Sequence, residues 1–120
     1  MSRVSVVVLS WNTAELTLKC LASVRAAFER GEAAGELVVV ENGSSDDSLA
    51  WIQASCPETL VLENPQNLGY AKGVNQGVAA STCEWILLLG SDAELQEGTL
   101  SRMGAVHRRR DGSHKLWIPT

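Results

Sequence analysis

Two uninterrupted apolar runs, each followed closely by a carboxylate, constrain the fold of this chain more than any other feature. Leu37–Val40 leads directly into Glu41, and Trp85–Leu89 leads through a short turn to Asp92. Continuous apolar runs of this length, bounded by turn residues, are typical of strands that are buried on both faces of a sheet. Open α/β sheets bind their ligands at the carboxyl ends of the strands. The two acids therefore predict a polar ligand or a metal ion at that end of the sheet.

Strand-like and helix-like segments alternate along the chain. Strands are expected at Val4–Leu9, Glu36–Glu41, Thr59–Glu63, Trp85–Leu89 and Lys115–Ile118, and helices at Ala14–Arg30, from Ser45 to before Pro57, at Tyr70–Ala80 and from Thr99 to about His107. Such alternation is typical of a parallel sheet with right-handed crossovers. A length of 120 residues is enough for one domain with its own core. We therefore predict a single α/β domain with a mostly parallel sheet of about four to five strands, flanked by helices.

Particular side chains are expected to fix the helices in place. Asn12 or Thr13 can cap the first helix, and Ser45 can cap the second. Gly73 and Gly77 lie four residues apart on one face of the third helix, which predicts close approach by a strand or a ligand. The apolar residues expected to pack the first two helices against the sheet are Leu16, Cys20, Leu21, Val24 and Phe28, then Leu49, Trp51 and Ile52.

Charge and composition exclude several classes of function. The formal net charge of −4 argues against nucleic acid as a partner, and we interpret the run Arg108–Arg110 as a solvated helix end. No apolar stretch approaches the ~20 residues of a membrane span, and no segment has the pattern of a signal peptide. The three cysteines, Cys20, Cys56 and Cys83, lack a metal-binding spacing. We therefore expect buried free thiols and a cytoplasmic location.

The residues after the strands leave alternatives open. Asp92 could hold a hard divalent ion shared with a substrate phosphate, or it could simply be a turn or capping residue. Glu41 could accept hydrogen bonds from a ribose or a base, or be a solvated acid at a strand end. Lys72 could meet a phosphate or be solvated. The first strand leads into Ser10-Trp11-Asn12 without phosphate-cradling glycines, which argues against a dinucleotide fingerprint or a P-loop.

Four segments with motif-like sequences follow one another along the chain. They are Val4–Asn12, Val40–Asp46, Asn64–Ala71 with Asn75 and Gly77, and Leu87–Leu89 with Asp92-Ala93-Glu94. Their order and spacing resemble the family 2 glycosyltransferases of GT-A fold, especially the rhamnosyltransferase-like members of bacterial polysaccharide synthesis. The resemblance covers about Val4 to Leu100.

The resemblance implies a Rossmann-like GT-A nucleotide-binding half over residues 1–120, truncated relative to the full catalytic domain of the family. It implies inverting transfer of a sugar from a UDP-, dTDP- or GDP-linked donor to a glycan or lipid-linked acceptor in cell-surface polysaccharide synthesis, with Mn or Mg as cofactor. Asp92 matches the metal-binding acid. The residues that match the nucleotide-sugar site are Ser10, Trp11, Asn12, Glu41, Asn42, Asn67, Gly69, Lys72 and Asp92.

The chain departs from the family pattern in three ways. Glu41 stands where the family usually has Asp, and Gly90-Ser91-Asp92 stands where it often has Asn-Pro-Asp. Family members also continue into an acceptor-binding half that carries the catalytic base. Glu94 and Glu97 are too close to the metal loop to replace that base, so no catalytic residue is assigned. The alternative is therefore a non-catalytic or truncated nucleotide-sugar-binding module.

The turn after the first strand argues against two other α/β classes. A receiver-like signalling domain would need acids after the first strand, and a nucleotidyltransferase would need a glycine-rich basic loop there. Ser10-Trp11-Asn12 supplies neither.

The apolar segments Trp85–Leu89 and Leu116–Ile118 would leave an open strand edge if later elements are missing, and such edges favour pairing with another strand. We therefore predict a homo-oligomer formed through this edge.

Overall fold

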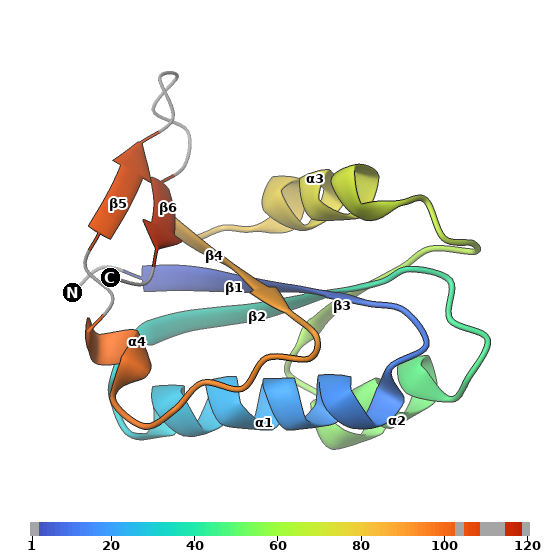
Figure 1. Cartoon of the computed structure of the whole chain (residues 1–120), viewed down its shortest axis with the longest axis horizontal. Coiled ribbons are helices and arrows are strands. Elements are labelled where there is room, and N and C mark those ends of the chain that lie inside the picture. The colour runs from blue at the N-terminus through green and yellow to red at the C-terminus, as the bar shows by residue number, and fades with distance from the viewer. Residues whose placement is uncertain (1–2, 103–104, 109–114, 119–120) are drawn as a thin grey trace.

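A single sheet with the strand order β3-β2-β1-β4-β6-β5 organises the molecule (Figure 1). The structure is a computed structural model that describes residues 3–102, 105–108 and 115–118. The strands are β1 (Arg3–Ser10), β2 (Ala34–Glu41), β3 (Leu60–Glu63), β4 (Trp85–Gly90), β5 (Ala105–Arg108) and β6 (Lys115–Ile118). Neighbouring strands run parallel except β5, which is antiparallel to β6. The predicted α/β class and mostly parallel sheet are confirmed, with β5 as an additional antiparallel strand in the described part of the chain.

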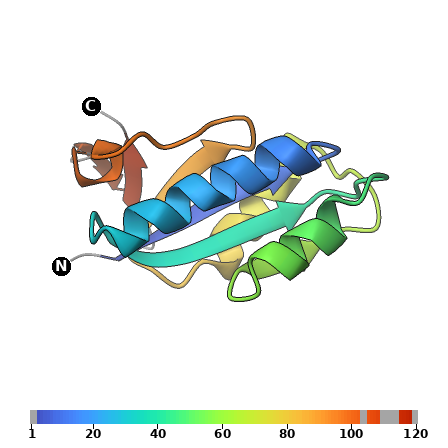
Figure 2. The same ribbon diagram turned by 90° about the horizontal axis from the view of Figure 1, so that it is seen from below.

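Helices cover both faces of the sheet. They are α1 (Ala14–Glu29), α2 (Ser48–Ser55), α3 (Tyr70–Ala80) and the short α4 (Thr99–Arg102). Figures 1 and 2 show α1 and α2 side by side on one face and α3 on the opposite face. This arrangement buries most of β1 and β2 on both sides, as the unbroken apolar run of β2 predicts.

The alternation of side chains along β1 divides the core into two layers. Val6 and Val8 point toward α1 and pack with Leu21 and Val24. Val7 points the other way and packs in a second cluster on the α3 side. Successive residues of a strand face opposite sides of the sheet, so the same Val-rich segment serves both layers.

Gly73 and Gly77 let α3 lie close to the sheet, as predicted. Both glycines are buried. A Cβ atom at Gly73 would lie 2.5 Å from Leu9 Cδ1, and one at Gly77 would lie 2.4 Å from Val7 Cγ1. The close approach is therefore to strand β1, and helix–sheet packing accounts for both glycines.

The predicted helix from Thr99 to about His107 is wrong in its second half. Helix α4 ends at Arg102, and Ala105–Arg108 forms strand β5, which pairs with β6 from Ala105↔Ile118 to Arg108↔Lys115. Backbone pairing with a segment farther along the chain overrides the local helical spacing. Arg108 thus ends a strand rather than a helix, and the other two arginines of its run lie outside the described residues.

Three apolar side chains are more exposed than predicted. Leu16 and Trp51 were expected to face the sheet, but 45% and 43% of their surfaces remain exposed. In β4, Ile86 and Leu87 are buried, whereas Leu88 is 38% exposed. The physical reason for Leu88 is that α3 lies mainly over β1 and β2, so it leaves part of the Leu88 side chain uncovered.

Candidate functional site

The carboxyl ends of β1, β2 and β4 meet at one end of the sheet. Ser10 is in register with Glu41 across β1 and β2, and Leu9 is in register with Gly90 across β1 and β4. The loops that follow β1 and β2 lie at the right of Figure 1, and the turn that follows β4 lies nearer its centre and contacts Thr13 before α1. The predicted site residues lie at the last residues of β1 and β2, on the loops after β1, β2 and β4, and on the loop and first turn that begin α3.

Glu41 is the most unusual residue of this region. Its side chain is only 2% exposed. Oε1 accepts the backbone N–H of Ser44 at 2.8 Å, whereas Oε2 is buried with no hydrogen-bond partner among the described residues. A buried carboxylate oxygen without a donor is costly. The position of the acid was predicted from the sequence, but its burial and unpaired oxygen were not.

Asn12 uses its side chain to hold the neighbouring loop. Its Oδ1 accepts the backbone N–H of Ser45 at 2.7 Å and that of Asp46 at 3.4 Å, and its own N–H donates to Ser44 Oγ at 2.8 Å. Its φ angle is 53°, in the left-handed region that Asn tolerates better than most residues. The side-chain oxygen of Asn12 is thus already occupied by backbone N–H groups of the loop after β2.

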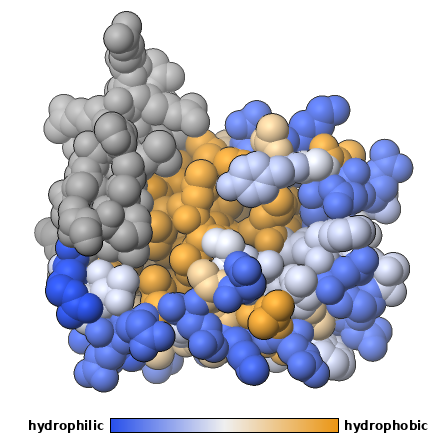
Figure 3. Space-filling view, viewed as in Figure 1, coloured by the Kyte–Doolittle hydropathy of each residue, from blue (hydrophilic) through white to orange (hydrophobic). Residues whose placement is uncertain are grey.

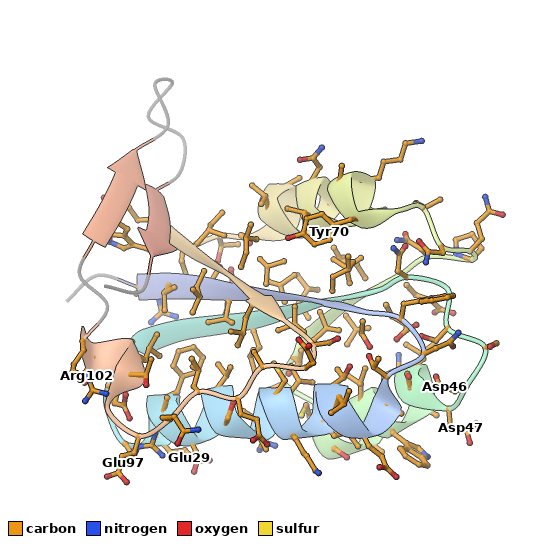
Figure 4. The ribbon with its side chains drawn as sticks, viewed as in Figure 1. Glu29, Asp46, Asp47, Tyr70, Glu97 and Arg102 are labelled. Atoms are coloured by element: carbon orange, nitrogen blue, oxygen red, sulfur yellow. The ribbon has the colours of Figure 1, made fainter. Side chains whose placement is uncertain are left out.

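Asp46 caps two helices at once, a role that the sequence analysis gave to Asn12 or Thr13 and to Ser45. Its Oδ2 accepts the backbone N–H of Ala14, the first residue of α1, at 3.4 Å. Its Oδ1 accepts the backbone N–H of Ser48, the first residue of α2, at 3.0 Å and also the Ser48 hydroxyl. Hydrogen bonds from the Ser48 side chain, then from backbone N–H groups, lower the pKa of Asp46 below its usual value. Thr13 occupies the N-cap position of α1, as predicted, but makes no side-chain cap hydrogen bond. The prediction of Ser45 as the cap of α2 is wrong, because Asp46 reaches both helix starts (Figure 4).

Asn42 is also bound to the protein. Its Nδ2 donates to Asn67 Oδ1 at 3.1 Å and to the carbonyl oxygen of Gly69 at 3.3 Å. Its Oδ1 accepts the backbone N–H of Leu68 at 3.0 Å and Asn64 Nδ2 at 3.1 Å. Asn42 therefore links the end of β2 to the loop before α3.

Other predicted residues remain accessible. Trp11 is 50% exposed, and Asn67, Gly69 and Lys72 are exposed on the loop and first turn of α3. Ser10 is buried, and its hydroxyl lies 2.8 Å from Thr17 Oγ1. Ser10 thus lies under this region, while the other four can meet a ligand from solvent.

Asp92 is exposed on the turn after β4, and α1 anchors that turn. The Thr13 hydroxyl donates to Ser91 Oγ at 3.3 Å, and Cys20 Sγ donates to the carbonyl oxygen of Gly90 at 3.6 Å. Burial raises the pKa of the Cys20 thiol to about 12, with smaller contributions from the Asp92 and Glu94 carboxylates. Cys20 therefore remains a neutral thiol beneath the turn, and all three cysteines are buried and free, as predicted.

An apolar groove of about 430 Å³ opens beside this turn. Its wall includes Val7, Val74 and Leu88, and Asp92 is its only carboxylate among the described residues. Tyr70, which is not among the site residues predicted from the sequence, lines it from α3 and is 70% exposed. Figure 3 shows the hydrophobic surface that lies below α3, and Figure 4 shows Tyr70 on the same side. An exposed aromatic at a helix start was the only signal for Tyr70 in the sequence.

The donor groups present suit a divalent ion only in part. Within residues 3–102, no three His, Cys, Asp or Glu side chains gather as a metal cluster. Mg²⁺ commonly binds through one or two carboxylates together with substrate phosphates. The exposed carboxylate of Asp92 fits this shared mode rather than a cage made by the protein alone.

None of the described helices is long and apolar enough to cross a membrane.

Comparison with known proteins gives consistent matches. The family model for glycosyl transferase family 2 matches residues 5–112. A PGL/p-HBAD biosynthesis glycosyltransferase of Mycobacterium bovis is 33% identical over 105 residues, which cover 84% of this chain and 40% of that protein. A TPR repeat-containing protein of Synechococcus elongatus is 34% identical over 95 residues, which cover 79% of this chain and 22% of that protein. The chain therefore spans well under half the length of these relatives.

Two solved structures share the fold. A mannosyltransferase from Pyrobaculum calidifontis in complex with GDP-Man and Mn²⁺ has a TM-score of 0.71 and 25% identity, covering 83% of this chain and 30% of that one. TarS residues 1–349 from S. aureus also has a TM-score of 0.71 and 25% identity, covering 82% of this chain and 30% of that one.

Proposed function

Because this chain belongs to glycosyl transferase family 2, we propose that it binds a nucleoside diphosphate sugar and serves an inverting glycosyl transfer. The proposed donor is UDP-, dTDP- or GDP-linked, and the proposed acceptor is a glycan or lipid-linked sugar of cell-surface polysaccharide synthesis. The single observation that carries the donor site is the buried, unpartnered Oε2 of Glu41 at the carboxyl end of β2.

The chemistry of Glu41 favours a ligand that brings an N–H or O–H group. A nucleobase imide or a ribose hydroxyl would donate to Oε2 and supply the hydrogen bond that the protein leaves unmade. Oε1 is held by Ser44, so the carboxylate is oriented before the ligand arrives. Asn67, Gly69 and Lys72 are exposed at the start of α3 and form the remaining side of the proposed site.

Asp92 is the proposed ligand of Mn or Mg. The Pyrobaculum mannosyltransferase was solved with GDP-Man and Mn²⁺, which supports a divalent ion here. When bound, such an ion neutralises the charge that develops on a diphosphate leaving group. The contribution of this chain is to hold the Asp92 turn in place through Thr13 and Cys20.

A nucleotide-sugar-binding module that does not itself transfer is the second candidate. The observation that favours it is the groove beside Asp92, which has no second carboxylate among its described lining residues to act as a general base. A general base typically contributes ~100 to 10,000-fold to the rate. For either candidate we propose a cytoplasmic location, which the three buried free cysteines support.

The binding test uses thermal unfolding of the chain with UDP, dTDP or GDP, with and without Mn²⁺. A nucleotide at ~100 times its dissociation constant should stabilise the fold by about 2.7 kcal/mol. Glu41→Gln should lose most of this gain, because the amide can present N–H groups where an acceptor is needed. Glu63→Gln is the matched control, since Glu63 ends the adjacent strand in register with Glu41 and is exposed.

The metal is tested with a second pair of variants. Asp92→Asn should abolish the extra stabilisation that Mn²⁺ adds to the nucleotide. Glu29→Gln should keep it, since Glu29 is exposed at the last residue of α1, whereas Thr13, which contacts the Asp92 turn, precedes the first residue of that helix. Nucleotide stabilisation that is equal in wild type and Glu41→Gln would refute the proposed donor site. Sugar transfer by the chain alone at about 10 per second would reject the non-catalytic candidate.

A further inference from the structure

A chain of side-chain amides connects α3 to the end of β2. Asn64 and Gln76 form a reciprocal pair, in which Asn64 Nδ2 donates to Gln76 Oε1 at 2.7 Å and Gln76 Nε2 donates to Asn64 Oδ1 at 2.8 Å. Asn64 Nδ2 also donates to Asn42 Oδ1 at 3.1 Å. Asn64 is buried, and its backbone N–H donates to the carbonyl oxygen of Glu41 at 2.9 Å.

This arrangement fixes the orientation of Asn42. An amide side chain has two donor hydrogens and one acceptor oxygen, and its flipped form exchanges them. Asn42 Oδ1 must accept from Asn64, and its Nδ2 then points toward Asn67 Oδ1 and the carbonyl oxygen of Gly69. The backbone N–H of Leu68 and the carbonyl oxygen of Gly69 require the same orientation of Asn42. The reciprocal bonds of Gln76 hold the Asn64 side chain against Asn42 Oδ1, so Gln76 supports the Asn42 amide from behind.

Asn42 in turn holds the loop before α3. It binds the backbone of Leu68 and Gly69 and the side chain of Asn67. The two loops also touch through their backbones, because a Cβ at Gly43 would lie 2.4 Å from the carbonyl carbon of Gln66. The loop of residues 66–69 thus depends on Asn42 for its position against β2.

We propose that Gln76 and Asn64 are positioning residues of the donor site. They hold Asn42 in place, and through it they help to place Asn67 and Gly69 near the end of β2 for the nucleotide. Neither residue faces the ligand itself in this scheme. The inference rests on the proposed function, because it assigns a purpose to the loop that the donor would meet.

The test compares Gln76→Met with Gln53→Met. Both substitutions replace a glutamine on a helix by a side chain of similar length, but Gln53 lies exposed on α2. The dissociation constant of UDP, dTDP or GDP with Mn²⁺ should rise about tenfold in Gln76→Met, the lower end of the loss seen when a hydrogen-bond partner behind a metal ligand is removed. It should not change in Gln53→Met. Val24→Ala, a fully buried site in the other core layer, controls for a general loss of stability and should leave the constant unchanged.

A second readout does not depend on any ligand. The backbone N–H groups of Leu68 and Gly69, which bond to Asn42 Oδ1 and Asn67 Oδ1, should exchange with solvent faster in Gln76→Met than in either control, by nuclear magnetic resonance. Unchanged exchange, or faster exchange with an unchanged dissociation constant, would overturn the positioning role. If the unaltered chain binds none of the three nucleotides, the proposed function fails, and the exchange rates still decide whether Gln76 orders the loop.

Discussion

Asn12 Oδ1 accepts the backbone N–H of Ser45 at 2.7 Å, so the turn after β1 holds the loop after β2 in place. All of α1 and β2 lies between the two residues in sequence, and the hydrogen bond joins two of the loops that border the candidate donor site. The side chain expected to contact a nucleotide therefore also builds the surface on which a nucleotide would lie.

The backbone of Asn12 provides a way to separate its two contributions. Asn12→Gly removes the side-chain hydrogen bonds but accepts the φ of 53°. Asn12→Ala removes the same bonds and must also adopt a left-handed conformation. We expect Asn12→Ala to be less stable than Asn12→Gly by roughly 1 kcal/mol in urea unfolding. Equal stability of the two variants would contradict the strained backbone.

Asp46 should make stability depend on pH in the acid range. Its pKa in the folded chain lies below the ordinary value of 3.8, so its carboxylate stabilises the fold fully above that value. The stabilisation is lost as the pH falls through the lower, folded-state pKa. Asp46→Ala should cost about 1 to 2 kcal/mol at pH 7, as expected for loss of a helix cap.

The control for this pH effect is the neighbouring acid. Asp47 makes no side-chain cap hydrogen bond at the start of α2. The difference in urea midpoint between wild type and Asp46→Asn should shrink as the pH falls from 5 toward about 2, while Asp47→Asn should show a smaller difference throughout. A difference for Asp46→Asn that is constant over this range would exclude the charge as its cause.

The sequence predicts the central sheet because its strands have strong local signals. The runs Val4–Leu9 and Leu37–Val40 lie inside β1 and β2 as expected, and the acid that ends β2 and the acid that follows β4 lie at the same end of the sheet. Composition and periodicity do not predict the hydrogen bonds that order the loops. Asn42 accepts a hydrogen bond from Leu68, and Asp46 accepts one from Ala14. In each pair the two residues are far apart in the sequence and come close only when the strands pair, so the sequence alone does not show these bonds.

Exposure was harder to predict than secondary structure. Leu88 belongs to an apolar run like that of β2, but whether its side is covered depends on where α3 packs, which the run itself does not determine. The same limit applies to Ala105–Arg108, where strand pairing with β6 replaced the predicted helix.

The two glycines of α3 should respond differently to alanine. Alanine normally improves a helix by about 1 kcal/mol relative to glycine. At Gly77 the new Cβ would press on Cγ1 of the buried, stiff Val7, so we expect Gly77→Ala to destabilise the fold by about 1 to 3 kcal/mol. At Gly73 it would meet only the end of the flexible, partly exposed Leu9 side chain. We expect Gly73→Ala to be neutral or stabilising.

A double substitution tests the cause of the Gly77 effect. Val7→Ala removes the methyl group that the new Cβ would meet, so the pair Gly77→Ala with Val7→Ala should be more stable than the sum of the single effects predicts. Strict additivity in urea unfolding would exclude this contact as the source of the destabilisation.

The open part of β4 leads us to keep the prediction of a homo-oligomer. Strand β6 pairs with β4 only at Trp85 and Ile86, so among the described strands none pairs with Leu87–Leu89 on that side. Leu88 is 38% exposed, and an unpaired apolar edge favours association with a second copy.

Sedimentation at micromolar concentration should give at least twice the 12.9 kDa of one chain. Leu88→Lys should shift the chain toward monomer, whereas Leu60→Lys should not, because Leu60 is similarly exposed but lies on the opposite outer strand, β3. A wild-type chain that sediments as a monomer would refute this prediction, and dissociation by Leu60→Lys alone would move the interface to β3.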